Sequence, residues 1–271
     1  MVKVNPQSPV ILITGGSSGI GEATARLFAG EGYRVVLAAR RYERLQALAQ
    51  EIQDAGGQAL AVETDVSQLA SIRNLVDATL AHYGQIDILF NNAGFGRLNW
   101  LEKLDPVDDI ETVIKTNLTG LIQTTWTVLP HMIQRRSGHI INMVSIAGLV
   151  ATPTYTIYAA SKFGGRGFTD SLRREVGVWG IRVSGIYPGA VYTEFPEHAG
   201  INRKTGITTP PFLVLSSETV ARAVFSLVRR PRRMLVIPWP MKIGWWFASL
   251  FPWISDRIFE WSFVRPERKG P

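Results

Sequence analysis

Short apolar segments alternate along the chain with longer amphipathic ones. The apolar segments are rich in Val, Ile and Leu without regular alternation, which is typical of strands buried on both faces of a sheet. They predict strands at 10–14, 34–38, 59–63, 86–90, 139–144, 182–187 and 234–238. The amphipathic segments predict helices at 19–31, 41–55, 67–83, 106–135, 155–178 and 217–229. Two of these helices are expected to have Ser67 and Ser217 as N-caps.

This order of elements predicts an α/β fold. Strands connected through helices form a parallel sheet with helices on both faces. We therefore expect a doubly wound parallel sheet of about seven strands in three αβα layers, which binds ligands beyond the carboxyl ends of its strands. No linker interrupts these elements, so we expect a single catalytic domain over 1–238 and a C-terminal extension over 239–271.

A glycine-rich turn follows the first predicted strand. Gly15, Gly19 and Gly21 allow a tight turn and a close approach of the backbone to a pyrophosphate. The next helix offers its free N–H groups and positive dipole end to the phosphates. Glycine also serves ordinary tight turns, but this position between strand and helix favours a Rossmann-like dinucleotide site. The same turn supplies further expected cofactor contacts, namely Ser17, Ser18 and Ile20.

Two arginines follow the second predicted strand. A site that prefers NAD usually has an acidic residue here to bind the ribose 2′-hydroxyl. This chain has Ala39, then Arg40 and Arg41, and a guanidinium can bind a 2′-phosphate through two hydrogen bonds. The pattern favours NADP(H) over NAD(H). The alternative is that both arginines form the solvated start of the next helix.

Tyr158 and Lys162 lie four residues apart on a predicted helix and therefore share one face. A neighbouring ammonium favours the phenolate, so we expect it to lower the pKa of Tyr158. Tyr158 could then exchange a proton with a carbonyl or alcohol oxygen, and Ser145, at the end of the fifth strand, could hold that oxygen. Taken singly, each residue also has an ordinary structural interpretation: a buried aromatic, a surface cation and a strand-end hydroxyl.

These motifs together resemble the short-chain dehydrogenase/reductase family, in the order in which that family has them. The matching positions are Thr14 to Gly21, Asn91 to Gly94, Asn117, Ser145, Tyr158 with Lys162, and Pro188-Gly189 with Thr193. The resemblance implies interconversion of carbonyls and alcohols by hydride transfer, without a metal. It implies that Lys162 also binds the nicotinamide ribose and that Asn117 holds a water that relays protons. The four His residues show no ligand spacing.

The resemblance also implies further cofactor contacts. Asp65 matches the acidic residue that binds the adenine, and the loop that contacts the nicotinamide amide corresponds to Gly189, Val191 and Thr193. The side of the adenine ribose is expected to be lined by Asn91, Ala93 and Gly94, although Asn91 and Asn92 could instead serve mainly to hold adjacent strands together. Residues 194–216 are expected to cover the substrate.

The charge of the chain is concentrated at one end. The 271 residues carry a net charge of +7 and contain no Cys, which excludes disulfides and cysteine-ligated metal sites. Residues 1–228 contribute +1 and residues 229–271 contribute +6. Five of the eight Trp residues also lie after residue 229. The tail is therefore basic and aromatic, whereas the rest of the chain is close to neutral.

This tail allows two interpretations. Its longest apolar run, 243–254, is too short to span a bilayer and contains Pro252. Aromatic side chains beside basic ones favour an interfacial anchor on a membrane surface. The alternative is that the tail packs on its own body, closes the pocket or forms a dimer contact. The tail also lacks the ending with which related chains build a tetramer.

The sequence thus predicts an NADP(H)-dependent oxidoreductase with a hydrophobic small-molecule substrate. Two alternatives remain: an NAD(H)-dependent dehydrogenase of a small polyol or sugar, and a membrane-associated cofactor-binding scaffold with little turnover. We expect a homo-oligomer, either a dimer or a tetramer, and no nucleic-acid partner. The N-terminus lacks an apolar signal core, so we expect a cytoplasmic protein and not a secreted one, peripheral to a membrane if the tail is an anchor.

Overall fold

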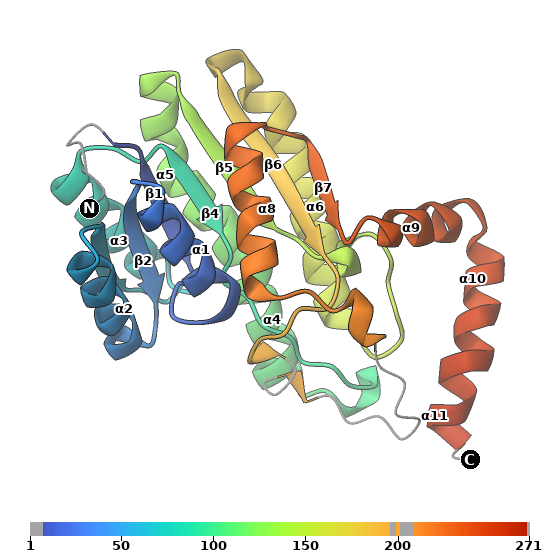
Figure 1. Ribbon diagram of the computed structural model, residues 1–271. Coiled ribbons are helices and arrows are strands. Elements are labelled where there is room, and N and C mark those ends of the chain that lie inside the picture. The colour runs from blue at the N-terminus through green and yellow to red at the C-terminus, as the bar shows by residue number, and fades with distance from the viewer. Residues whose placement is uncertain (1–7, 196–198, 201–208, 270–271) are drawn as a thin grey trace.

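The computed structural model describes residues 8–195, 199–200 and 209–269. Its sheet has seven parallel strands in the order β3-β2-β1-β4-β5-β6-β7 (Figure 1). The strands are β1 Val10–Thr14, β2 Arg34–Ala39, β3 Gln58–Glu63, β4 Ile88–Asn91, β5 Gly138–Met143, β6 Ile181–Pro188 and β7 Met234–Ile237. The predicted Rossmann-like doubly wound sheet is confirmed, and each strand end lies within two residues of its predicted position.

Helices cover both faces of the sheet and form its two cores. One face carries α1 Gly19–Gly30, α2 Tyr42–Asp54 and α8 Ser217–Arg229. The other carries α3 Leu69–Tyr83, α5 Leu121–Arg135 and α6 Thr156–Val176. Within β1, Ile11 and Ile13 enter the first core, whereas Val10 and Leu12 enter the second. Because both faces are buried, the strands need apolar residues at successive positions.

The helix N-termini correct two predictions. Ser216, not Ser217, caps α8: its backbone is extended and its Oγ accepts a hydrogen bond from the N–H of Thr219 at 3.2 Å. Ser67 does not cap α3, which begins at Leu69 without a side-chain cap. The backbone N–H of Ser67 instead donates to the Asp65 carboxylate at 2.9 Å. An N-cap must keep a non-helical backbone, which Ser217, already in the helix, does not have.

The predicted helix 106–135 is helical throughout but not uniform. Wider π-helical turns at Pro106–Glu111 and Lys115–Gly120 lie on either side of the short α4, Thr112–Ile114. The Asp105 carboxylate caps the start by accepting from the N–H groups of Val107 and Asp108. Such turns often occur at functional sites, and the second one contains Asn117.

The strand order reverses at β1, between β2 and β4. At such a switch point the loops after neighbouring strands diverge, which leaves a crevice at the carboxyl ends of the strands. The turn after β1 and the loops after β4, β5 and β6 all open on this edge. The fold therefore brings the motifs from residues 14 to 193 to one side of the sheet.

Residues 239–269, here called the C-terminal arm, leave the sheet after β7. The arm contains α9 Pro240–Leu250, α10 Pro252–Phe259, a π-helical turn Glu260–Val264 and α11 Arg265–Lys269, and it extends beside the body in Figure 1. Its end contacts the body again: the Arg268 guanidinium pairs with the Glu102 carboxylate and lies 3.8 Å from the centroid of the Trp100 ring. In the described part of the chain, every helix is too short or too polar to cross a bilayer.

Candidate active site

A cavity of about 2100 Å³ opens at the carboxyl ends of the strands. Sixteen of the nineteen residues predicted for the site line it. They are Gly15, Ser17, Ser18, Gly19, Ile20, Arg40, Arg41, Asp65, Ala93, Gly94, Ser145, Tyr158, Lys162, Gly189, Val191 and Thr193. Residues up to 178 positions apart in the chain therefore line the same cavity. This is expected at a switch point, where the loops after neighbouring strands diverge.

Asn91 does not line this cavity, and its role as a cofactor contact stays a prediction. Its side chain is 4% exposed, and its amide donates to Thr125 Oγ1 and Asn142 Oδ1, both at 2.9 Å. These bonds connect β4 to β5 and α5. The alternative interpretation, that Asn91 holds adjacent strands together, fits the structure.

Gly21 and Asn117 also lie behind the cavity wall. Gly21 packs against the Gly15 carbonyl oxygen, so it shapes the turn from behind. Asn117 is 1% exposed and holds the backbone of Phe95: Nδ2 donates to the Phe95 carbonyl at 2.8 Å, and Oδ1 accepts from its N–H at 3.0 Å. Asn117 Oδ1 also lies directly behind Gly94. It supports the loop after β4 in this structure.

The glycine turn depends on close backbone packing at three points. Gly15 has a φ of +68°, and a Cβ there would lie 2.9 Å from the Cα of Ala93. Gly19 has a φ of +55° and faces Thr193. A Cβ on Gly21 would lie only 2.1 Å from the Gly15 carbonyl oxygen. A side chain at any of these positions would displace the turn that is expected to bind the pyrophosphate.

A Gly21→Ala substitution should therefore weaken NADPH binding by at least about tenfold, because the backbone must move away from its phosphate-binding position. Fluorescence titration with NADPH measures this loss. Gly30→Ala is the matched control, since Gly30 ends the same helix and an added Cβ there meets nothing within 4 Å. Equal NADPH affinity of the two variants would contradict the role assigned to the turn.

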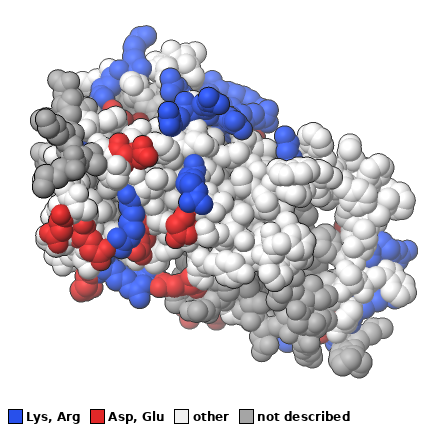
Figure 2. Space-filling view, viewed as in Figure 1, with Lys and Arg blue, Asp and Glu red and all other residues white. Residues whose placement is uncertain are grey.

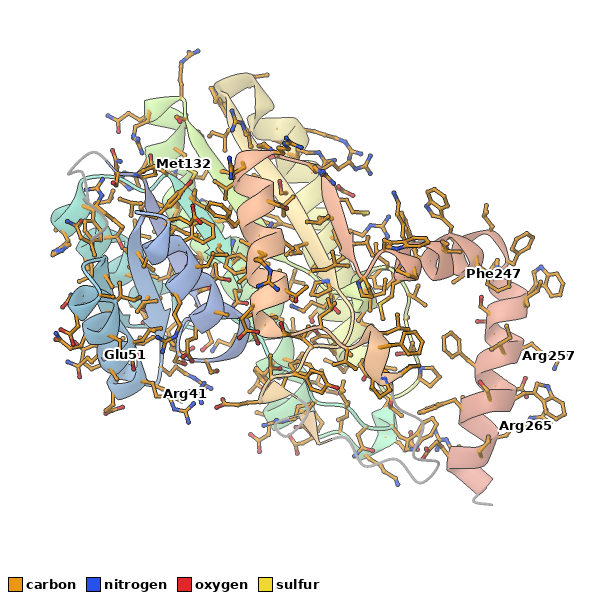
Figure 3. The ribbon with its side chains drawn as sticks, viewed as in Figure 1. Arg41, Glu51, Met132, Phe247, Arg257 and Arg265 are labelled. Carbon is orange, nitrogen blue, oxygen red and sulfur yellow. The ribbon has the colours of Figure 1, made fainter. Side chains whose placement is uncertain are left out.

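Arg41 reaches the glycine turn, and Arg40 does not. The Arg41 guanidinium donates to Ser17 Oγ at 3.2 Å and to Ser18 Oγ at 2.6 Å. Its third contact is with the carboxylate of Glu194 at 2.8 Å, which Arg44 also binds at 2.8 Å. Figure 3 places Arg41 at the start of α2, beside the turn that precedes α1. Arg40 also lines the cavity, but it is exposed.

Glu194 was not predicted from the sequence. Hydrogen bonds from Arg44 and Arg41 lower the pKa of its carboxyl to about 2, so it is charged at neutral pH. A carboxylate thus lies between two guanidinium groups beside the glycine turn. No local sequence pattern connects residue 194 with residues 41 and 44, because the contact depends on the folded loop after β6.

Ser145 and Tyr158 meet at the other end of the cavity. Ser145 follows β5 with a φ of +129°, an unusual conformation for a residue with a Cβ. Its Oγ accepts from the N–H of Ala147 at 3.2 Å, and the Ser145 hydroxyl acts to lower the pKa of the neighbouring Tyr158 phenol. Tyr158, on the first turn of α6, is 9% exposed. The two hydroxyls therefore form one pair that faces the cavity.

Lys162 lies one helical turn after Tyr158. Its Nζ donates to the Met143 carbonyl at 3.0 Å and lies 5.5 Å from the centroid of the Tyr158 ring. Burial lowers the pKa of Lys162 to about 8. The predicted lowering of the Tyr158 pKa is wrong for this structure: burial raises it to about 12 and outweighs the hydrogen bond with Ser145. Removal from water disfavours the phenolate more than its neighbours stabilise it.

Several apolar residues around Tyr158 were not predicted. The Phe195 ring lies 5.3 Å from the Tyr158 ring and packs against Gly96, where a Cβ would approach the Phe195 ring to 2.7 Å. Of the loop expected to cover the substrate, residues 196–198 and 201–208 lie outside the described residues. The C-terminal arm adds further apolar lining with Met241, Trp245, Phe259 and Phe263. The sequence offered only the aromatic content of the arm as a signal for this contact.

Known proteins share this arrangement. The short chain dehydrogenase family model matches residues 9–203. An uncharacterised oxidoreductase of Staphylococcus saprophyticus is 34% identical over 86% of this chain and 94% of its own length. The NADP-dependent 3-hydroxy acid dehydrogenase of Salmonella typhimurium is 37% identical over 82% of this chain and 90% of its own.

A solved structure extends the comparison. The short-chain dehydrogenase/reductase of Burkholderia phymatum in complex with NAD superposes with a TM-score of 0.82 at 25% identity, over 94% of this chain and 97% of its own. NADP-dependent and NAD-bound proteins thus both resemble this chain, and the family binds nicotinamide cofactors of both kinds. With the family model covering most of the sheet and all of the expected motifs, the chain belongs to the short-chain dehydrogenase/reductase family of oxidoreductases.

Proposed function

We propose that this protein is an NADP(H)-dependent oxidoreductase that interconverts a hydrophobic carbonyl compound and its alcohol. The observation that carries the proposal is one cavity with Arg41 at one end and the Ser145–Tyr158 pair beside Lys162 at the other. The turn after β1 has glycines at the positions where the backbone must come close to a pyrophosphate. The residues present therefore fit a phosphorylated dinucleotide.

The catalytic residues would handle the proton. A bound nicotinamide cofactor supplies or accepts the hydride at the carbonyl carbon. During reduction, Ser145 holds the carbonyl oxygen and Tyr158 donates its phenolic proton to that oxygen, which yields the alcohol. With its pKa raised to about 12, Tyr158 carries this proton throughout the neutral range. The Lys162 ammonium, 5.5 Å from the ring centroid, stabilises the phenolate that remains. In oxidation the proton moves in the opposite direction.

The preference for NADP(H) rests on Arg41. Its guanidinium is fixed on the two serine hydroxyls of the turn, and it binds a carboxylate in this structure. A site that holds one anion between Arg41 and Arg44 offers the charge and the donors that a 2′-phosphate requires. In addition, Ala39 ends β2 where an NAD-preferring site would have an acidic residue.

Glu194 should compete with the 2′-phosphate for these arginines. We therefore expect Glu194→Gln to bind NADPH about three- to tenfold more tightly, because a neighbouring negative charge is removed. The affinity for NADH, which lacks this phosphate, should change little. Fluorescence titrations with both cofactors measure the two affinities. If NADPH binding weakens instead, Glu194 serves mainly to position Arg41 and does not compete for it.

A hydrophobic substrate is supported by the lining near Tyr158. Phe195 packs on Tyr158, Trp245 and Phe259 line the same cavity, and apolar walls favour apolar ligands. A panel of carbonyl compounds, followed by NADPH absorbance, tests the proposed function. Aromatic or long-chain ketones should be reduced with a higher kcat/KM than short polar ones. Faster NAD-dependent oxidation of polyols or sugars would favour the alternative dehydrogenase, and no turnover on any member would favour the scaffold.

A further inference from the structure

The C-terminal arm has two apolar faces. On α9, residues 241, 244, 245, 247 and 248 line the cavity, and four of them, 241, 244, 245 and 248, have the spacing of three and four that marks one side of a helix. On the opposite side, Trp239, Ile243, Trp246 and Leu250 are 54–72% exposed. The rest of the arm repeats this pattern, with Phe259 and Phe263 towards the cavity and Trp253 and Trp261 exposed.

The exposed face is large and rich in tryptophan. Seven large apolar side chains between residues 239 and 261 are 44–72% exposed and stand apart from the cavity lining: Trp239, Ile243, Trp246, Leu250, Phe251, Trp253 and Trp261. Figure 2 shows this part of the molecule as a mostly uncharged surface. A continuous apolar surface of this kind is unusual on a soluble protein and marks a binding surface for a partner or a membrane.

Cations accompany the exposed tryptophans. The Lys242 ammonium lies 5.2 Å from the Trp246 ring centroid, and the Arg265 guanidinium lies 4.1 Å from that of Trp261. Arg257 is 70% exposed on the side of α10 that faces away from the body (Figure 3). Glu260 is already paired with Arg257 and Arg265. Trp residues next to Lys and Arg are typical of the headgroup level of a bilayer.

The arginine cluster 229–233 does not belong to this face. It precedes β7, whereas the arm follows β7, so the strand separates them; Figure 2 shows basic side chains where α8 meets β7, away from the arm. Without this cluster, residues 239–269 carry five basic and three acidic residues, a net charge of +2. The attraction to an anionic surface is therefore modest, and aromatic burial must provide most of the binding.

We propose that the outer face of the arm docks on the surface of a bilayer that contains anionic phospholipid. Tryptophan at the headgroup level and an excess of positive charge favour a lipid surface over a second copy of this chain, whose arm would carry the same charge. The arm would lie in the interface, since its helices cannot cross the bilayer. Its inner face would then border both the membrane and the cavity, which gives a lipid-dissolved substrate of the proposed function a short path to Tyr158.

Flotation of the full-length protein on lipid vesicles tests this proposal. We expect wild type to bind vesicles of phosphatidylcholine with a quarter of phosphatidylglycerol, and to bind pure phosphatidylcholine several-fold more weakly. A triple variant, Trp246→Ser, Leu250→Ser and Trp253→Ser, should lose at least about tenfold in binding, because its three side chains face outward and away from the cavity. The matched control is Trp126→Ser, since Trp126 is 59% exposed on α5; it should bind as wild type does.

Two flotation results would overturn the proposal: no binding of wild type to either vesicle, or equal binding of wild type and the triple variant. A third is a dimer of wild type in light scattering that the triple variant does not form, with neither protein bound to lipid. The last result would assign the face to a second copy of the chain. NADPH titration of the same samples keeps the two proposals separate. Retained NADPH binding without flotation rejects only the docking, and flotation without NADPH binding rejects only the proposed cofactor.

Discussion

Tyr158→Phe should lower kcat for carbonyl reduction by about a hundred- to ten-thousand-fold, the contribution typical of a positioned general acid. The phenylalanine ring fills the same buried space beside Phe195, so the fold and the cavity are retained. Only the phenolic hydroxyl beside Ser145, the proton donor, is removed. Steady-state kinetics with NADPH and the best ketone of the panel measure the loss, and fluorescence titration should show NADPH affinity within about threefold of wild type.

Tyr155→Phe is the control for this variant. Its ring lies 6.2 Å from that of Tyr158, it also borders the cavity, and residue 159, one turn later, is Ala and not Lys. We expect it to keep at least about a tenth of the wild-type kcat, because it lacks the paired ammonium. A Tyr158→Phe variant with wild-type turnover, or equal losses in both variants, would reject Tyr158 as the proton donor.

The second large effect is expected at the adenosine end of the cavity. Arg41→Ala should weaken NADPH binding by about ten- to a hundredfold, which corresponds to the loss of a charge-assisted hydrogen bond of roughly 1.5–3 kcal/mol. NADH lacks the 2′-phosphate, so its affinity should fall by no more than about threefold. The ratio of the two dissociation constants, obtained by titration of the same protein sample, measures the selectivity directly.

Arg40→Ala supplies the comparison. It removes the same charge from the adjacent position, but Arg40 is exposed and makes none of the hydrogen bonds to the turn that Arg41 makes. We therefore expect a smaller change in selectivity, of the size that a screened surface charge produces. A larger effect at Arg40 would transfer the phosphate contact to that residue. Wild type that binds NADH more tightly than NADPH would reject the cofactor preference altogether.

The sheet could be predicted from the sequence because its strands are buried on both faces. Continuous apolar runs such as 10–13 and 35–39 are stable mainly where both faces are buried, and the helices between them fix a parallel order. Helix ends were less predictable, since Ser216 and Ser217 are both good capping residues and only the backbone conformation distinguishes them.

Most of the site followed from motifs, but its long-range contacts did not. The glycine turn, Ser145, Tyr158 and Lys162 each have a local pattern, and the fold brings them together at the switch point. Glu194 binds residues about 150 positions earlier in the chain, and no local pattern encodes that contact. The raised pKa of Tyr158 was also missed, because burial of a side chain by Phe195 and its neighbours is a property of the whole fold.

The loop after β6 contacts both ends of the cavity through two adjacent residues. Glu194 is bound to Arg41 and Arg44, and Phe195 packs on Tyr158. A ligand that displaces Glu194 from the arginines would therefore also change how firmly the next residue, Phe195, is held against Tyr158. Such linkage is reciprocal: if cofactor binding alters the affinity for substrate, substrate alters the affinity for cofactor by the same factor. The affinities for cofactor and substrate would thus be coupled through this one loop.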